Sequence, residues 1–186
     1  MNWTNSQDRY GRLSIALHWL MFLLLVAGYT CIELREYYPK GSDTREALKT
    51  WHFMLGLTVF TLVWFRLLAR MLQVMPAITP PLSPIVHLLG RLVHLLLYLF
   101  MIAMPVLGWL TLSAEGDAIP FWGLTLPPLV APDEQLAEQV EEIHELIGTA
   151  GYFLIGLHAA AALVHHYFFR DNTLVRMLPG KSLSRR

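Results

Sequence analysis

Four long apolar stretches, separated by short polar segments, dominate the pattern of the chain. A helix needs about 20 mainly apolar residues to cross the core of a bilayer, and each stretch meets or approaches that length. The second apolar stretch, Thr50–Phe65, is the shortest because Arg66 and Arg70 end it. Long arginine side chains can extend their charged heads to the membrane surface, so the helix can continue to residue 70. We therefore predict four transmembrane helices, near residues 13–33, 50–70, 88–112 and 144–169.

The predicted fold is an all-α, integral membrane four-helix bundle that forms a single domain over residues 1–186. The composition agrees, because 55% of the residues are hydrophobic and 15% are charged, whereas a soluble domain carries about 25% charged residues. The first apolar stretch is longer than the core of about 7–15 residues found in a cleavable signal peptide. We therefore expect this stretch to be retained as a membrane span.

The distribution of charge predicts the orientation of the helices. With the amino terminus inside, ten cations and two acids fall on the inner side, against four cations and twelve acids outside. Cytoplasmic loops carry an excess of Lys and Arg, so we expect both termini to be cytoplasmic. The inner cations are Arg9, Arg12, Arg66, Arg70, Arg91, Arg170, Arg176, Lys181, Arg185 and Arg186. The net charge of zero leaves no excess of positive charge for phosphates, which argues against nucleic-acid binding.

The connections between the predicted helices differ in character. The inner connection at residues 75–84 is rich in proline and should be extended, because proline lacks the amide donor that a helix needs. The outer segment at residues 113–130 places prolines among aromatic residues, which predicts a compact loop on the membrane surface. From Pro132 onward, apolar residues at three- and four-residue spacing predict an amphipathic helix that runs into the fourth span.

Eight histidines are the main candidates for chemistry, and at least five fall within the apolar spans or at their ends. His144 and His158 project from nearly the same face of one helix, about 21 Å apart along its axis. His18 lies near the inner start of the first span, and His52 lies near the outer start of the second. In an antiparallel bundle we therefore expect His52 to meet His144 at the outer level, and His18 to meet His158 at the inner level.

Two facing histidine pairs across a membrane favour two bis-histidine b haems, since each iron takes one imidazole from either side. A tetrahedral metal site would need more ligands than each pair offers. Gly151 lies midway between His144 and His158, where a missing side chain allows close approach of a porphyrin or of another helix. We predict two haem b groups; for any single histidine, a bond to a neighbouring helix is the plainer alternative.

Three further residues are candidates for contacts with the cofactors. Arg66 follows His52 by 14 residues, so it returns to nearly the same face at the inner level, where it could bond haem propionates or anchor at the interface. His94 is a rival to His18 as a ligand of the inner haem. We expect His94 and His165 to contact propionates or a quinone, with solvated interface residues as the alternative.

Six short motifs form a recognisable set. They are Arg12-Leu-Ser-Ile-Ala-Leu-His18-Trp19, Trp51-His52 with Gly56, Pro105-Val-Leu-Gly108, Ile143-His144-Glu145, Gly156-Leu-His158-Ala-Ala-Ala-Ala-Leu-Val-His165-His166-Tyr167 and Asp171-Asn-Thr-Leu-Val-Arg-Met-Leu-Pro179. The set resembles the prokaryotic cytochrome b561 family. The resemblance covers essentially the whole chain and keeps the order of the four spans, and the motif at residues 156–167 is long enough to be specific.

The resemblance implies a multi-pass cytochrome of the bacterial inner membrane with two haem b groups. The family's ligand pattern, one histidine on each of the first two helices and two on the fourth, falls on His18, His52, His144 and His158. Within the family, the chain resembles members that oxidise periplasmic superoxide to dioxygen and pass the electrons to ubiquinone. An oxidoreductase of this kind needs no catalytic residues beyond the haem ligands.

The charge of the outer side bears on the electron donor. Its four cations and twelve acids repel an anion such as superoxide unless a local basic patch attracts it, and all four cations lie at residues 35–49. The acidic segment at residues 133–145 would attract a cationic donor such as a basic cytochrome c. Two alternatives stay open: a haem b membrane-anchor subunit that serves another dehydrogenase or a soluble cytochrome, and a transporter or structural protein without haem.

Overall fold

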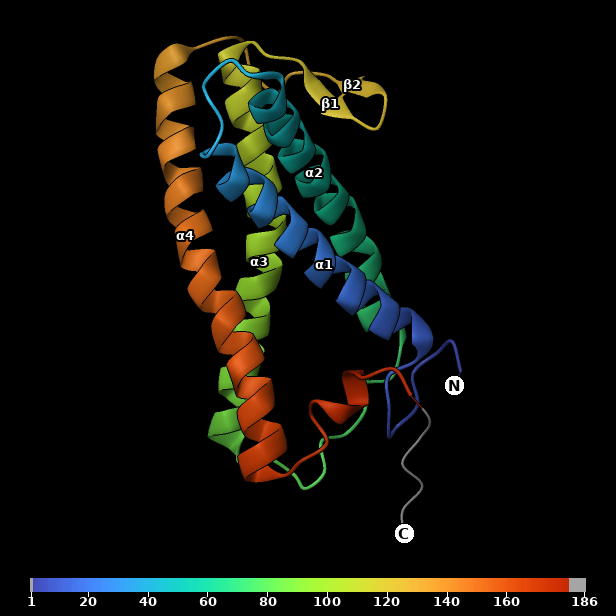
Figure 1. Cartoon of the computed structure of the whole chain (residues 1–186). Coiled ribbons are helices and arrows are strands. Elements are labelled where there is room, and N and C mark those ends of the chain that lie inside the picture. Colours follow the sequence, from blue (N-terminus) through green and yellow to red (C-terminus); the bar gives the residue numbers. More distant parts are fainter. Residues whose placement is uncertain (1, 181–186) are drawn as a thin grey trace. The chain divides into compact units, whose positions relative to one another are not determined.

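The structure, a computed structural model, describes residues 2–180 of the chain. It is all-α, with four long helices (Figure 1): α1 (Arg12–Arg35), α2 (Asp43–Leu72), α3 (Pro84–Glu115) and α4 (Glu134–Val164). A short antiparallel hairpin, β1 (Ile119–Phe121) and β2 (Leu124–Leu126), follows α3. A π-helical turn (His165–Phe169) continues α4, and a 3-10 helix (Val175–Met177) comes after it. The cations Lys181, Arg185 and Arg186, assigned to the inner side from the sequence, lie outside the described residues.

All four helices are long and apolar enough to cross a membrane. Many of the large side chains exposed on them are apolar; Phe153, Ile85 and Leu146 are 78%, 72% and 71% exposed. A monomeric soluble protein rarely exposes large contiguous apolar patches to water, whereas the hydrocarbon core of a bilayer solvates such a surface. The structure is therefore consistent with the predicted membrane protein of four spans.

α2 and α4 begin before their apolar stretches because polar side chains cap their first turns. Ser42 Oγ accepts a hydrogen bond from the backbone N–H of Arg45 at 3.3 Å. The Asp133 carboxylate accepts one from the backbone N–H of Leu136 at 3.1 Å. Such bonds satisfy amide donors that have no partner within the helix. As the amphipathic pattern predicted, α4 begins near Pro132 and runs without interruption into the fourth span.

The described residues group into two compact units. Unit 1 contains residues 2–20, 64–98 and 152–180, and unit 2 contains residues 21–63 and 99–151. Each long helix therefore contributes one segment to each unit. His18 and His158 belong to unit 1, whereas His52 and His144 belong to unit 2. The two predicted histidine pairs thus fall in separate units.

The two ends of the described chain meet in unit 1 (Figure 1). The indole N–H of Trp19 donates a hydrogen bond to the carbonyl of Met177 at 2.8 Å. The guanidinium of Arg176 lies 5.5 Å from the ring centroid of Tyr10 and donates to the carbonyl of Pro76 in the proline-rich connection. That connection contains neither helix nor strand before α3 begins, as predicted. We call these joined terminal segments, residues 2–11 and 170–180, the terminal cap.

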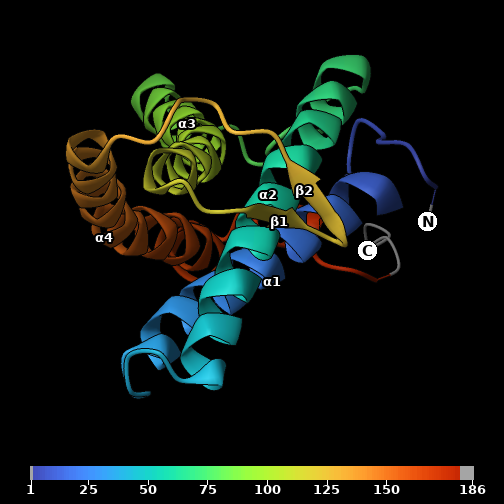
Figure 2. The ribbon, with the colours of Figure 1, turned by 90° about the horizontal axis from the view of Figure 1, so that it is seen from above.

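In unit 2 the hairpin lies beside α2 (Figure 2). Its register pairs Ile119 with Leu126, Pro120 with Thr125 and Phe121 with Leu124. Ile119 is 2% exposed and packs in one cluster with Leu57 of α2 and Leu112 of α3. The segment predicted as a compact loop is therefore partly ordered as a β-hairpin, while its first residues, 113–115, extend α3.

Candidate functional site

In unit 2, the side chains of His52 from α2 and His144 from α4 face each other. Their ring centroids are 6.1 Å apart and the ring planes are 73° apart. The Nδ1 of His52 lies 2.9 Å from the carbonyl oxygen of Gly28 in α1, which can only accept, so Nδ1 carries the proton. The Nε2 of His52 then keeps its lone pair. A backbone carbonyl that accepts from the second ring nitrogen is the usual way to orient a metal-ligating histidine.

In unit 1, three histidines come together. The ring centroids of His18 and His158 are 6.1 Å apart with the planes at 70°, and those of His94 and His158 are 5.2 Å apart with the planes at 69°. His94 therefore lies beside the same histidine as His18, as its place on the third span suggested. The sequence alone left His94 as a rival ligand.

The spacing of the rings tests whether these pairs suit a haem iron. A metal–nitrogen bond is about 2 Å long, and a ring centroid lies roughly 1 Å beyond its nitrogen, so two imidazoles on one iron have centroids about 6 Å apart. The separations of His52 from His144 and of His18 from His158 both match this value. The separation of His94 from His158 is shorter. Within residues 2–180 no group of three or more His, Cys, Asp or Glu side chains could hold a bare metal ion.

Arg66 of α2 contacts His18 directly. Its Nη2 lies 3.0 Å from His18 Nδ1, and its Nε donates to the hydroxyl of Tyr98 at 3.3 Å. A guanidinium only donates, so His18 accepts at Nδ1, and in a neutral imidazole the proton is then on Nε2. Ligation of iron through Nε2 needs the lone pair of that nitrogen. Ligation by neutral His18 therefore requires Arg66 to release Nδ1, and the freed guanidinium can bond an anionic group nearby.

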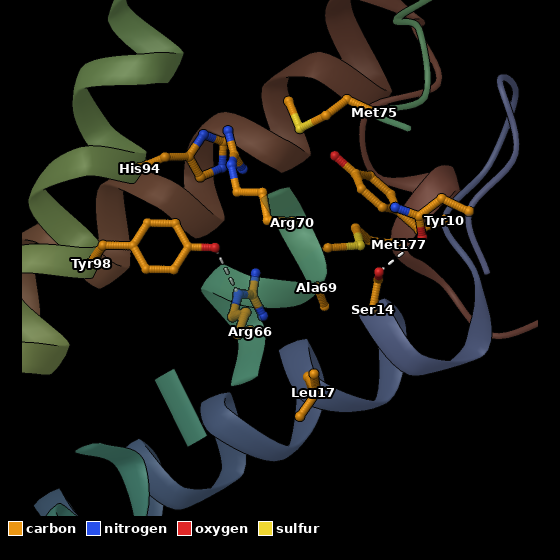
Figure 3. Close-up of a pocket in the computed structure, with 11 residues that line it drawn as sticks. Tyr10, Ser14, Leu17, Arg66, Ala69, Arg70, Met75, His94, Tyr98 and Met177 are labelled. Carbon is orange, nitrogen blue, oxygen red and sulfur yellow. Dashed lines mark hydrogen bonds between the residues drawn. The ribbon is translucent and has the colours of Figure 1, made fainter. Parts of the chain in front are cut away.

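A polar pocket opens next to Arg66 in unit 1 (Figure 3). Two of the three predicted cofactor contacts, Arg66 and His94, line it, and Tyr98 and Arg70 stand on the same side. The full lining also includes Asn5, Tyr10, Ser14, Leu17, Ala69, Met75 and Met177. Two guanidinium groups, an imidazole and two phenols can bond either carboxylates or the carbonyl oxygens of a quinone.

His165, the third predicted contact, is not among the residues that line the pocket. It lies in the π-helical turn, and its Nδ1 is 2.5 Å from Oδ2 of Asp171. The other carboxylate oxygen of Asp171 accepts the backbone N–H of Thr173 at 2.8 Å. Burial alone would raise the pKa of Asp171, but the hydrogen bonds from His165 and Thr173 outweigh it and hold the pKa below its usual value. Asp171 is therefore an ionised, buried part of the terminal cap.

We expect Asp171→Asn to destabilise the protein at neutral pH, by about 1.5–3 kcal/mol for hydrogen bonds to a charged group. Because the folded-state pKa of Asp171 is depressed, its carboxylate contributes fully above the ordinary value of about 3.9. That contribution disappears as the pH falls through the lower folded-state pKa. Thermal unfolding of both proteins between pH 7 and pH 3 checks this: the gap in midpoint should narrow only below about pH 4. A constant gap at all pH values would contradict it.

Two glycines of unit 2 face side chains from other helices. A Cβ built on Gly108 of α3 would lie 3.5 Å from the ring of His144. One built on Gly151 of α4 would collide with the hydroxyl of Tyr29 and the ring of Phe100. The space beside Gly151, noted in the sequence as a close-approach position, is therefore filled by two aromatic side chains from α1 and α3.

Comparison with known proteins gives the family. The model of the family described as prokaryotic cytochrome b561 matches residues 9–180. The chain belongs to this family. It is 36% identical over 174 residues to cytochrome b561 homolog 1 of Escherichia coli K12, covering 94% of this chain and 99% of that protein. It is also 36% identical over 173 residues to the probable superoxide oxidase CybB of Yersinia pestis, covering 93% of this chain and 97% of that protein.

A third relative, cytochrome b561 homolog 2 of Escherichia coli K12, is 31% identical over 192 residues, with 99% and 98% of the two chains covered. As a cytochrome b561, the protein is a multi-pass membrane protein that carries electrons through haem b.

The pocket lining includes two residues that the sequence did not single out for it, Arg70 and Tyr98. Arg70 follows Arg66 by four residues, and Tyr98 follows His94 by four residues. Side chains four residues apart are neighbours on one face of a helix. Helical spacing from Arg66 and His94 could therefore have found Arg70 and Tyr98.

Proposed function

We propose that the protein is a di-haem b cytochrome that oxidises superoxide to dioxygen and reduces ubiquinone. Two superoxide ions each lose one electron, and one ubiquinone takes up two electrons and two protons. In this proposal the whole chain, residues 1–186, works as a single domain of the bacterial inner membrane, with both termini in the cytoplasm. The superoxide reaction is also the one named for the Yersinia relative, at 36% identity.

The observation that carries the proposal is the presence of two histidine pairs, one in each unit, with equal ring separations of 6.1 Å. A single haem would need only one such pair. Two pairs held by different segments of the same helices suit electron transfer from one side of a membrane to the other. In this assignment His52 and His144 would hold the iron of the outer haem, and His18 and His158 would hold that of the inner haem.

Haem, when bound, supplies one-electron transfer, and the chain's own residues hold and tune the site. The Gly28 carbonyl fixes the tautomer and orientation of His52. Arg66, released from His18, would hold the propionates of the inner haem, with its Nε beside the hydroxyl of Tyr98.

The polar pocket of unit 1 is the proposed site for the quinone headgroup. His94 and Tyr98 lie on one side of it, and Tyr10 and Ser14 lie on the other. Their N–H and O–H groups can bond the carbonyl oxygens of ubiquinone as these become hydroxyls. His165, paired with Asp171 outside this lining, is proposed to act at the cytoplasmic side of the same site rather than as a direct quinone contact.

The haem content of the purified protein, measured as the pyridine haemochrome, tests the proposal first. We expect two haem b per chain that superoxide reduces rapidly and ubiquinone reoxidises. If the protein held two haems that superoxide did not reduce, the assignment as a di-haem cytochrome would stand, and superoxide would be excluded as its donor. Absence of haem would overturn the assignment of the histidines.

A soluble cationic donor is the second candidate, and the start of α4 favours it. Exposed carboxylates lie along this segment up to the helical turn that contains His144: Glu134, Glu138, Glu141, Glu142 and Glu145. Such a surface attracts a basic protein. An electron-transfer subunit served by a separate soluble protein would use this surface, whereas superoxide would be repelled from it.

Lys49 distinguishes the two donors. Its Nζ lies 5.7 Å from the ring centroid of Phe53, the residue after His52. It is also 3.4 Å from a carboxylate oxygen of Glu115 and 3.6 Å from one of Asp117. We expect Lys49→Gln to slow haem reduction by superoxide several-fold, and Glu115→Gln with Asp117→Asn to accelerate it, because these changes alter the local attraction of an anion.

The measurement is the second-order rate of haem reduction in rapid mixing at low salt and at high salt. Both effects should shrink at high salt because exposed charges are screened. An uncharged reductant serves as the control and should reduce all variants at one rate. If Lys49→Gln accelerated reduction by superoxide, anion attraction at Lys49 would be wrong.

A further inference from the structure

The connection between α3 and α4 contains the hairpin and a long segment without charged residues. Residues 118–132, between Asp117 and Asp133, contain no Asp, Glu, Lys or Arg. Two of its large apolar side chains are well exposed: Trp122 at the turn is 54% exposed, and Leu124 of β2 is 65% exposed. Neither the proposed haem sites nor the quinone pocket uses these side chains.

The side chain of Trp122 at the hairpin turn reaches the apolar part of α2. The indole N–H of Trp122 donates a hydrogen bond to Thr58 Oγ1 at 2.9 Å. Thr58 lies nine residues after Lys49, which is about 13 Å along the helix axis. Lys49 marks the charged end of α2, because it pairs there with Glu115 at the end of α3. The Trp122 side chain therefore reaches past the charged end of α2 toward the middle of an apolar stretch.

The backbone of the hairpin limits how far it can enter the membrane. In a hairpin with a two-residue turn, the backbone groups of Phe121 and Leu124 form hydrogen bonds with each other. The backbone N–H and C=O groups of the next pair, Pro120 and Thr125, point away from the partner strand. Pro120 has no N–H, so β1 presents no outward donor at this position. Thr125 still presents one, which water can satisfy at the membrane surface but hydrocarbon cannot.

Trp122 occupies a strained position. Its φ is +48° and that of Gly123 is +85°, as in the type I′ turn, which favours Asn-Gly and disfavours a bulky residue in the first place. Its side chain compensates with two contacts to α2: the bond to Thr58 and an edge-to-face contact with Trp51, whose ring centroid is 5.7 Å away. Tryptophan favours the membrane–water interface because its side chain combines an apolar ring system with a polar N–H group.

We propose that the β1–β2 hairpin is a membrane anchor that lies in the lipid interface, with Leu124 and Trp122 against the acyl chains and the edge of Thr125 toward the headgroups. Its partner is lipid, and not a soluble protein. The anchor holds the part of α2 around His52 at a fixed depth in the membrane. A water-soluble donor must then approach beside the hairpin, over Lys49 and the start of α4.

Spin-label accessibility of the full-length protein in phosphatidylcholine–phosphatidylglycerol vesicles tests this. In a Cys31→Ser background, a nitroxide is placed at Leu124→Cys, with Phe153→Cys as the lipid control and Glu138→Cys as the water control. Both control positions are exposed in the structure. We expect the label at residue 124 to collide with oxygen more than with a water-soluble nickel chelate, as at residue 153. A ratio like that at residue 138, or protection from both reagents, would overturn the proposal.

Trp122→Asn provides a second test, because it gives the turn its preferred Asn-Gly sequence and removes the contacts to α2. We expect the label at residue 124 to become more accessible to the nickel chelate while the helix content stays unchanged. An unchanged accessibility would mean that Trp122 does not hold the hairpin in the interface. Neither measurement needs haem, so the anchor can fail while the cytochrome assignment holds, or the reverse.

Discussion

Replacement of His158 by alanine is expected to remove one haem and leave about half of the haem b absorbance. His158 of α4 is the residue that His18 and His94 both approach in unit 1. Without its imidazole only one histidine of the pair would be left to hold a haem in unit 1, whereas the pair of His52 and His144 in unit 2 is untouched. The pyridine haemochrome, together with the reduced absorption spectrum, measures the haem that is retained.

The complementary variant is His52→Ala, which should also halve the haem content but remove the other absorption component. His87, exposed on α3 and outside both pairs, is the control, and His87→Ala should keep the full haem content. His94→Ala separates the two candidate partners of His158: it should keep both haems if His18 is the ligand. Retention of both haems in His158→Ala would refute the ligand assignment.

Gly151→Ala is expected to destabilise the protein strongly for the addition of a single methyl group. The new Cβ would overlap the hydroxyl of Tyr29, which donates to the carbonyl of Gly148 at 2.7 Å, and the ring of Phe100, which is 7% exposed. Overpacking of this kind costs about 1–3 kcal/mol. The midpoint of thermal unfolding in detergent should fall by several degrees.

Gly156→Ala is the matched control, because a Cβ built on Gly156 of the same helix meets nothing within 4 Å. Alanine is also the better helix former, by about 1 kcal/mol at an exposed position, so this variant should be as stable as the parent or more so. If both variants lost the same thermal stability, local crowding at Gly151 would not be the cause.

The sequence predicted the features that depend on regular spacing. The 14 residues between His144 and His158 place both on one helix face, and the expected neighbours, His52 and His18, are the residues found beside them. The four spans followed from apolar length in the same way. The orientation, the number of haems and the ligand roles stay predictions.

Features that depend on contacts between distant residues could not be predicted in this way. The bond between Arg66 and His18 joins residues 48 positions apart, and no local pattern signals it. The hairpin was not predicted because its turn has the sequence Trp122-Gly123, whereas Asn-Gly is the sequence that usually indicates a two-residue hairpin turn. The early start of α2 at Asp43 was not predicted either. Its first turn is charged and capped by Ser42, so it does not form part of the apolar stretch from which the helix was predicted.

The terminal cap makes the chain suitable for circular permutation. Arg9 donates to the carbonyl of Leu178, so a short linker can join the described segments 2–11 and 170–180 without disturbing either one. New ends can be opened at Gly41, which has open space around it, in the connection between α1 and α2. The permuted chain would have to insert its first helix in the reverse direction while its folded contacts stayed the same. Its yield in membranes would therefore separate the influence of insertion order from that of the final fold.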